Sequence, residues 1–389
     1  MRSRRPISIN NSLVHGICNC NCSTCGVNKP AYHGPRAMQE REVTDALIRR
    51  VLEAAREGVH VRYIANSGDG EPTLHPEFTA RMNAFGGMRR SWSHPTLPAP
   101  DVSVVTNGLR LVEPEVLDAI CDNDILLFIS FPTCVPEHYG EIMFSDAAKG
   151  KTMLTKALAG IQAAMKRAAA GELKRLAFHV SPPVREHIRG DFAKTLECLS
   201  SGAAKFGLKE LEFVLFPATS NRTGLIPSLG KGIDFFKDLT RRYHNRTVNG
   251  VRIRMAPSFK RFYPRFGDLV DLMKSHDAPC IWNGNLFISP FGDSACCNDQ
   301  TIRWPEGNIL SHSVRELMEK KETRVPGPAC RGCDQRPEKL RGSLLVWVYR
   351  IWAGIKTRRT LRKAETLREL PACTGCAEGC GSSMERSVA

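Results

Sequence analysis

The sequence lacks a continuous apolar segment of about 18 residues, the length that a membrane-spanning helix needs. It also lacks the apolar run of a secretory signal, because the segment after the basic stretch Met1–Pro6 is interrupted by serine and asparagine residues up to Val14. The 15 cysteines are therefore not expected to form the disulfide framework of a secreted protein. These absences predict a cytoplasmic protein in a reducing compartment.

The charge of the chain is unbalanced, with 55 Lys and Arg against 40 Asp and Glu and a formal net charge of +15 at pH 7. Such an excess suits an anionic partner, for example nucleic acid, a phosphorylated substrate or an acidic membrane surface. The basic residues are dispersed, however, except near the C-terminus, and no RNA-binding module is recognisable. Nucleic acid is therefore not an expected partner.

Strand and helix periodicities alternate along most of the chain. The predicted strands are Ile7 to Ile17, Val59 to Ala65, Val102 to Val105, Ile125 to Ser130, Arg175 to Val180 and Leu211 to Phe216, with Val251 to Met255 as a further strand. The predicted helices are 40–57, 76–90, 113–121, 153–170, 191–206 and 233–243. Repeated strand–helix units imply parallel strands with right-handed crossovers, and so an α/β fold.

One predicted strand also indicates which side chains face inward. The large apolar side chains should face the outer helices, and they are Leu176, Phe178 and Val180. Strand alternation then places the others on the inner face, and they are Ala177, His179 and Ser181. His179 is therefore either a substrate or cofactor contact or a buried structural histidine.

Four cysteines lie within eight residues near the start of the chain, at 18–25. Cys18, Cys22 and Cys25 follow the spacing C-x3-C-x2-C, and three thiolates on a four-iron cube leave one iron without a protein ligand. An open metal position is where a metal site does chemistry. The alternative is a structural zinc site with Cys20 as the fourth thiolate, although zinc ligands usually come as two separated C-x2-C pairs.

A Gly-rich turn, Ser67–Leu74, follows the second predicted strand. Gly68 and Gly70 lack side chains, so the backbone can approach a ligand closely, and Pro72 stiffens the exit from the turn. In combination with the three-cysteine loop after the first strand, this turn resembles the radical S-adenosylmethionine (radical SAM) superfamily. The resemblance implies a partial (β/α)6 TIM-like barrel.

The resemblance also implies cofactors and roles for particular residues. The cluster that Cys18, Cys22 and Cys25 would hold is a [4Fe-4S] cluster, whose open iron binds S-adenosyl-L-methionine. An injected electron cleaves that cofactor to methionine and a 5′-deoxyadenosyl radical, which takes a hydrogen atom from the substrate. The expected cofactor contacts are the main-chain carbonyls of Asp69 and Gly70, the side chain of Glu71 and, against the ribose, Ser130. The implied electron donor is a reductant such as flavodoxin or ferredoxin.

A second cysteine-rich region begins where the strand–helix alternation ends. A predicted hairpin, Asn285–Gly292, lies between two cysteines and resembles the opening of the SPASM domain, which carries one or two auxiliary [4Fe-4S] clusters in many radical SAM enzymes. The ligands that this resemblance implies are Cys280, Cys297, Cys330, Cys333, Cys373, Cys376 and Cys380, with Cys296 available as an eighth. The alternative is a zinc ribbon built from two C-x2-C pairs, Cys330 with Cys333 and Cys373 with Cys376.

The two regions predict two domains, a radical SAM partial barrel at 1–275 and a small cysteine-rich SPASM-like domain at 276–389. Residues 341–363 interrupt the second cysteine pattern as a predicted basic amphipathic helix, with Trp352 on its apolar face. This helix either makes a peripheral contact with an anionic membrane surface or packs its apolar face on the barrel.

These features predict a radical SAM enzyme of the oxidoreductase or maturase type. The predicted substrate is a peptide or protein that the enzyme crosslinks or oxidises, with the auxiliary clusters as an electron relay. An alternative is a radical SAM dehydrogenase that acts on a small molecule such as a sugar, an aminocyclitol or a lipid. RNA modification is supported by the charge alone.

Overall fold

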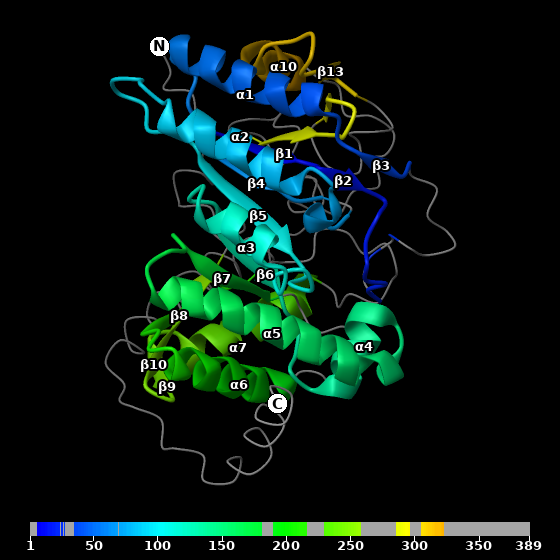
Figure 1. Ribbon diagram of the computed structural model, residues 1–389, viewed down its shortest axis with the longest axis vertical. Helices are drawn as coiled ribbons and strands as arrows, with labels where there is room; N and C mark the ends of the chain where they lie inside the picture. Colours follow the sequence, from blue (N-terminus) through cyan, green and yellow to red (C-terminus); the bar gives the residue numbers. More distant parts are fainter. Residues whose placement is uncertain are drawn as a thin grey trace, which may run out of the picture.

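Parallel strands run through the centre of the molecule, and helices cover one of their faces (Figure 1). The computed structural model describes residues 6–23, 25, 27, 35–68, 70–180, 190–215, 229–257, 285–295 and 305–322. The strands are β1 (Ile7–Asn11), β2 (Val14–His15), β3 (Ala37–Met38), β4 (Val61–Asn66), β5 (Asp101–Thr106), β6 (Leu126–Ser130), β7 (Leu176–Val180), β8 (Glu210–Leu215), β9 (Arg246–Val248), β10 (Val251–Pro257), β11 (Asn285–Ile288), β12 (Asp293–Ala295) and β13 (Gly307–Asn308).

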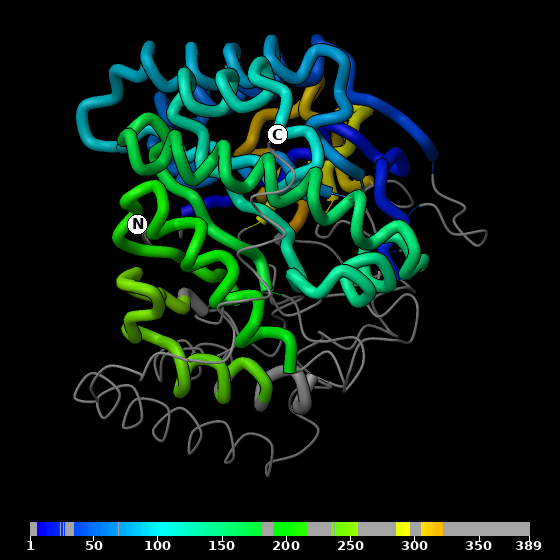
Figure 2. The backbone as a smooth tube through the Cα atoms, turned by 60° about the horizontal axis from the view of Figure 1, so that its bottom comes forward, coloured from blue at the N-terminus to red at the C-terminus, as the bar shows by residue number. Residues whose placement is uncertain are grey.

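The helices alternate with these strands along the chain. They are α1 (Arg41–Arg56), α2 (Phe78–Arg90), α3 (Pro114–Cys121), α4 (Pro136–Phe144), α5 (Gly150–Ala169), α6 (Asp191–Lys205), α7 (Leu229–Tyr243) and α10 (Val314–Glu322), with single 3-10 turns η1 (Pro72–Leu74) and η2 (Ala147–Lys149). Neighbouring helices pack side by side as a curved outer layer, α1 on α2, α2 on α3 and α5 on α6 (Figure 2). Within the described ranges, no helix is both long enough and apolar enough to cross a membrane.

One 11-stranded sheet has the order β13-β12-β11-β1-β4-β5-β6-β7-β8-β10-β9. Every neighbouring pair from β11 through β10 is parallel, and the outer pairs are antiparallel. The predicted α/β fold with a large parallel sheet is therefore confirmed, and each predicted strand–helix unit is present. The open order of the strands is consistent with a partial TIM-like barrel.

The first predicted strand is shorter than its apolar pattern indicates. β1 ends at Asn11, and the chain bends before the separate strand β2 pairs with β3. At the bend, the Ser12 amide donates to the Ile288 carbonyl at 2.9 Å, and the Ser12 hydroxyl donates to the Val14 carbonyl at 3.1 Å. β1 therefore ends six residues before the cysteine loop, which begins at Cys18.

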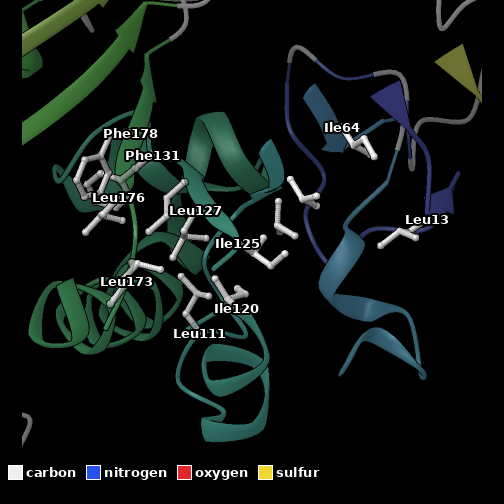
Figure 3. Packing of buried hydrophobic residues seen from close by; sticks show 14 of the residues in the cluster. Leu13, Ile64, Leu111, Ile120, Ile125, Leu127, Phe131, Leu173, Leu176 and Phe178 are labelled. Atoms are coloured by element: carbon white, nitrogen blue, oxygen red, sulfur yellow. The ribbon is translucent and has the colours of Figure 1, made fainter. Parts of the chain in front are cut away.

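The hydrophobic core lies between the sheet and the helices (Figure 3). Leu176, Phe178 and Val180 belong to this core together with side chains from the helices, as predicted for this strand. Ala177 instead joins a smaller cluster formed by strand residues alone, among them Phe128. The predicted alternation of inner and outer faces in β7 is thus confirmed, and Ser181 lies outside the described residues.

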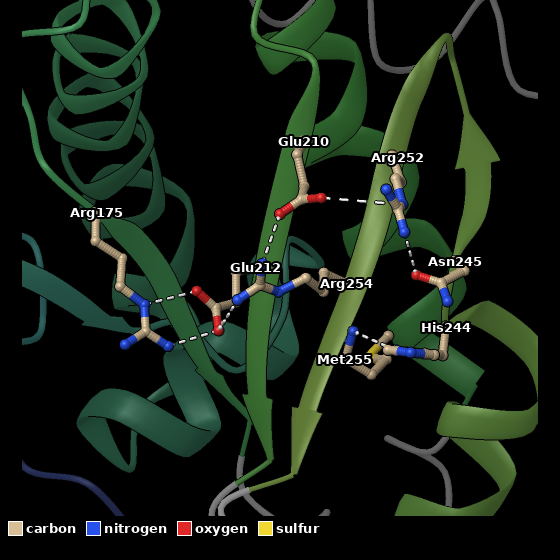
Figure 4. Close-up of polar contacts among 8 residues, drawn as sticks. All are labelled: Arg175, Glu210, Glu212, His244, Asn245, Arg252, Arg254 and Met255. Atoms are coloured by element: carbon tan, nitrogen blue, oxygen red, sulfur yellow. Dashed lines mark hydrogen bonds and ion pairs between the residues drawn. The ribbon is translucent and has the colours of Figure 1, made fainter. Parts of the chain in front are cut away.

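Ion pairs hold together the inner face of β7, β8 and β10 (Figure 4). The Arg175 guanidinium donates two hydrogen bonds to the Glu212 carboxylate, at 2.7 and 2.5 Å. Arg254 reaches the same carboxylate at 3.5 Å and Glu210 at 3.3 Å. Arg175 also lies 5.1 Å from the ring centroid of Phe128. Glu212 is buried, so these pairs supply the charge compensation that a carboxylate needs there.

The strands β11, β12 and β13 extend the sheet beside β1. The predicted hairpin is confirmed, because β11 and β12 pair antiparallel, with Phe287 opposite Ala295. β11 is parallel to β1, and the Arg50 side chain of α1 donates to the carbonyls of Ile309 and Leu310. The sheet therefore continues past the predicted domain boundary at 275, and the division into two domains stays a prediction.

Candidate cofactor site

The predicted cofactor segments meet at the edge of the sheet where the parallel strands end. The cysteine loop follows β1 and β2, the Gly-rich turn follows β4, Ser130 ends β6, and His179 is the next to last residue of β7. Parallel strands point the same way, so their carboxyl ends gather at one edge, which is the usual place of ligand sites in α/β folds. The structure therefore brings together segments that are more than 150 residues apart in the chain.

The cysteine loop places its thiols in two different environments. Cys18, Cys22 and Cys25 are half-buried and carry no disulfide, whereas Cys20 is only 3% exposed and packs in the hydrophobic core. The Cys20 amide donates to the Cys18 sulfur at 3.3 Å, and the Cys25 amide closes a turn on the Cys22 carbonyl at 3.1 Å. Hydrogen bonding with Cys20 lowers the pKa of the Cys18 thiol, although burial acts in the opposite direction.

Helix α4 holds the cysteine loop in place by hydrogen bonds. The sequence periodicities did not predict this helix. Two amides of the loop donate to α4 carbonyls, Asn21 to Met143 at 2.9 Å and Ser23 to Ile142 at 2.8 Å. The sulfurs of Cys22 and Met143 lie 3.9 Å apart. A usable signal was present, because α4 begins with proline at its first position, where a missing amide hydrogen costs nothing.

The Gly-rich turn packs directly against the strand that leads into the cysteine loop. A side chain added at Gly70 would place its Cβ 2.4 Å from the Val14 carbonyl oxygen and 3.0 Å from that of Ile17. The next amide, that of Glu71, donates to the Ile17 carbonyl at 3.0 Å. Gly70 is therefore required for contact with the protein's own backbone, a reason that the sequence pattern alone does not reveal.

Glu71 joins the Gly-rich turn to the end of β5. Its carboxylate is 3% exposed and accepts hydrogen bonds from the Thr73 amide and hydroxyl at 3.2 and 2.7 Å, the Thr106 hydroxyl at 2.7 Å and the Asn107 amide at 2.8 Å. Burial raises the pKa of Glu71, and these hydrogen bonds oppose the shift without cancelling it. Both carboxylate oxygens thus serve the fold, and the predicted contact with an ammonium group stays a prediction.

Ser130 and His179 are neighbours on the inner face of the sheet. They are register partners between β6 and β7, and the His179 ring lies 5.2 Å from that of Phe128. Burial, aided by the charge of Arg175, lowers the pKa of His179 to about 4. The imidazole is therefore neutral at physiological pH and can act as a hydrogen-bond donor and acceptor there.

The donor set of the loop fits an iron–sulfur cluster. Thiolates are the ligands that such clusters take, and the three half-buried thiols lie on one short loop with amide hydrogens directed at the Cys18 sulfur. In the part of the chain that the structure describes, no three His, Cys, Asp or Glu side chains gather closely enough to hold a single metal ion. A four-iron cube does not need such a gathering, because each thiolate binds a different iron.

The remaining predicted site residues lie outside the described residues. They are Asp69, Cys280, Cys296, Cys297, Cys330, Cys333, Cys373, Cys376 and Cys380, together with the helix predicted at 341–363. Their roles stay predictions, as do those of Gly70, Glu71 and Ser130 toward a cofactor.

The three-cysteine loop and the Gly-rich turn thus lie side by side at the carboxyl edge of a parallel α/β sheet. Residues 12–169, which contain both segments, match the sequence model of the Radical SAM superfamily. Residues 12–169 are therefore a radical SAM domain, and enzymes with this domain use a [4Fe-4S] cluster and S-adenosyl-L-methionine. No curated protein matches the chain in sequence.

Solved structures of other proteins share the fold at low sequence identity. The crystal structure of Streptococcus suis SuiB bound to S-adenosylmethionine is 13% identical, with a TM-score of 0.52 over 84% of this chain and 70% of SuiB. The structure of SuiB bound to the precursor peptide SuiA is also 13% identical, with a TM-score of 0.51 over 84% of this chain and 69% of SuiB. The structure of anSMEcpe with bound AdoMet is 15% identical, with a TM-score of 0.59 over 98% of this chain and 99% of that one.

Proposed function

We propose that Cys18, Cys22 and Cys25 hold the [4Fe-4S] cluster and leave one iron for S-adenosyl-L-methionine. The observation that carries this proposal is the position of the cysteine loop inside the family match and directly beside the Gly-rich turn. The chemistry supplied by the bound cluster is one-electron cleavage of S-adenosyl-L-methionine to methionine and a 5′-deoxyadenosyl radical. The substrate would give up a hydrogen atom, which would convert this radical to 5′-deoxyadenosine, and the substrate atom that carried the hydrogen would be the site of modification.

The chain's own residues hold and shape this site. Carbonyls of α4 orient the cysteine loop, and the Gly70 backbone keeps the turn in contact with Ile17. Ser130 and the neutral His179 offer hydrogen bonds on the inner face, where a ribose or a substrate would lie. The buried apolar side chains around Phe128 lie next to His179 on the same face.

We infer that the substrate is a peptide or protein. Support comes from two similar folds, since SuiB has been crystallised with the precursor peptide SuiA and both SuiB and anSMEcpe bind S-adenosylmethionine. The cysteine-rich C-terminal region adds support, because auxiliary clusters would relay the electron that an oxidation or crosslink releases.

The test of the substrate class measures 5′-deoxyadenosine released by the reduced, anaerobically reconstituted enzyme with added cell-extract fractions. We expect a peptide fraction to stimulate release several-fold above the uncoupled rate, and protease treatment of that fraction to remove the stimulation. A Cys22→Ala variant is the control for release that does not depend on the cluster. Stimulation by a protease-resistant small-molecule fraction would replace the peptide proposal with the small-molecule dehydrogenase.

A separate prediction concerns the seven C-terminal cysteines proposed as ligands of auxiliary clusters, Cys280, Cys297, Cys330, Cys333, Cys373, Cys376 and Cys380. Reconstituted protein should carry about 12 irons and as many sulfides, the content of three four-iron cubes. The triple Ala variant of Cys18, Cys22 and Cys25 should keep about two thirds of that iron, because its auxiliary cubes remain. Elemental analysis that finds stoichiometric zinc and a single cube would favour the zinc ribbon instead.

A further inference from the structure

Asn107, the first residue after β5, lies where the cysteine loop and the Gly-rich turn meet. Its amide donates to the Glu71 carboxylate at 2.8 Å, which connects it to the Gly-rich turn. Its side-chain nitrogen donates to the Asn19 side-chain oxygen at 2.7 Å and lies 3.9 Å from the Cys18 sulfur. One residue therefore contacts both the turn and the cysteine loop.

The orientation of the Asn107 side-chain amide is determined by its surroundings. Its oxygen accepts a hydrogen bond from the Leu109 backbone amide at 3.0 Å. Exchanging the side-chain oxygen and nitrogen would set two donors against each other, so the NH2 group faces the cysteine loop. That group has two hydrogens, one for Asn19 and one for the Cys18 sulfur.

Asn107 is also shielded from water. It is 6% exposed, and Cys18 is half-buried. A hydrogen bond to a charged sulfur is stronger in such a site than in water, because the local dielectric is low. Water, which would compete with the amide for the sulfur, has little access.

We propose that Asn107 raises the reduction potential of the cluster by donating to the Cys18 thiolate. This proposal rests on the proposed function, since it takes Cys18 as a cluster ligand. Reduction adds negative charge that spreads onto the cysteine sulfurs, so a donor stabilises the reduced state more than the oxidised one. Asn107 is thus a positioning residue, which acts on the cofactor through Cys18.

The test is a redox titration of the fully reconstituted protein, followed by the paramagnetic resonance signal that changes when S-adenosyl-L-methionine is added. Asn107→Asp keeps the acceptor for the Leu109 amide and loses the donor, and Asn107→Leu loses both. We expect both variants to shift the midpoint of this signal to more negative potential. At the wild-type midpoint, the ratio of reduced to oxidised cluster should fall by at least about threefold. The free energy that corresponds to this change is smaller than the contribution of one charge-assisted hydrogen bond.

The matched control is Asn123→Asp, which changes an equally buried asparagine at another turn. Asn123 donates to the side chain of Asn83 at 2.7 Å and to the Ala119 carbonyl at 2.9 Å. It belongs to no segment of the cofactor site, so its replacement should leave the midpoint unchanged.

Each outcome decides the question. An unchanged midpoint with wild-type iron content in the Asn107 variants would overturn the proposal and leave the ligand assignment intact. Loss of the responsive cluster in both variants would also overturn it, because Asn107 would then be purely structural. If Cys18→Ala keeps the responsive signal, the ligand assignment itself fails, which is a different result from either of these.

Discussion

Replacing Cys22 by alanine is expected to abolish the reductive cleavage of S-adenosyl-L-methionine, and the same result is expected for Cys18 and Cys25. Each variant leaves the proposed cluster with two protein thiolates, and no other cysteine among the described residues follows the motif spacing. The loss should exceed about 100-fold, because removing even an outer partner of a metal ligand costs 10- to 100-fold. The measurement is 5′-deoxyadenosine formed after dithionite reduction.

Cys20→Ala is the matched control, since it removes a thiol from the same loop. The Cys20 sulfur is buried in the hydrophobic core, while its backbone amide, which alanine retains, donates to Cys18. We expect this variant to keep most of the activity and to lose about 1 kcal/mol of stability from the small cavity. Equal loss of activity in Cys20→Ala and Cys22→Ala, with iron content equally reduced, would contradict the ligand assignment.

Local sequence patterns predicted much of the fold because each parallel α/β unit has the same alternation of strand and helix periodicity, which can be recognised from neighbouring residues. The alternation in β7 is an example: large side chains at 176, 178 and 180 identified the helix-facing side, and the structure confirms it. A period of two is decided by neighbouring residues alone, so it can be followed in the sequence. The bend at Ser12 escaped prediction because its partner, Ile288, lies far away in the chain.

The sequence predicted the motifs of the candidate site but not the contacts between them. The cysteine spacing, together with the resemblance to the radical SAM superfamily, identified the three cysteines and the Gly-rich turn as cofactor segments, and the family match includes both. The contacts that hold them are long-range, such as Cys22 with Met143 and Glu71 with Asn107. Such pairs depend on how the sheet folds in three dimensions, and no local periodicity specifies them. Asn107 therefore looked like an ordinary turn residue in the sequence.

Glu71 shows how the long-range contacts change the expected role of a predicted site residue. If its carboxylate served mainly as a cofactor contact, its removal would weaken binding of S-adenosyl-L-methionine and leave the fold intact. In the structure the same carboxylate accepts four hydrogen bonds from Thr73, Thr106 and Asn107 in a buried position. The contacts thus predict that Glu71 holds the Gly-rich turn against β5 whether or not a cofactor is present.

Glu71→Ala is accordingly expected to lower the free energy of unfolding by about 3 kcal/mol or more, since each buried donor left without an acceptor costs about 1–3 kcal/mol. Glu71→Gln should cost less, because its amide oxygen still accepts from Asn107 and its nitrogen can donate to a threonine hydroxyl. Urea titration of the reconstituted protein measures both. Glu113→Gln is the control, as its pair with Arg110 is partly exposed and should change stability by less than about 1 kcal/mol. An unfolding curve of Glu71→Ala that overlays the wild-type curve, with weaker binding of S-adenosyl-L-methionine, would return Glu71 to the role of a cofactor contact alone.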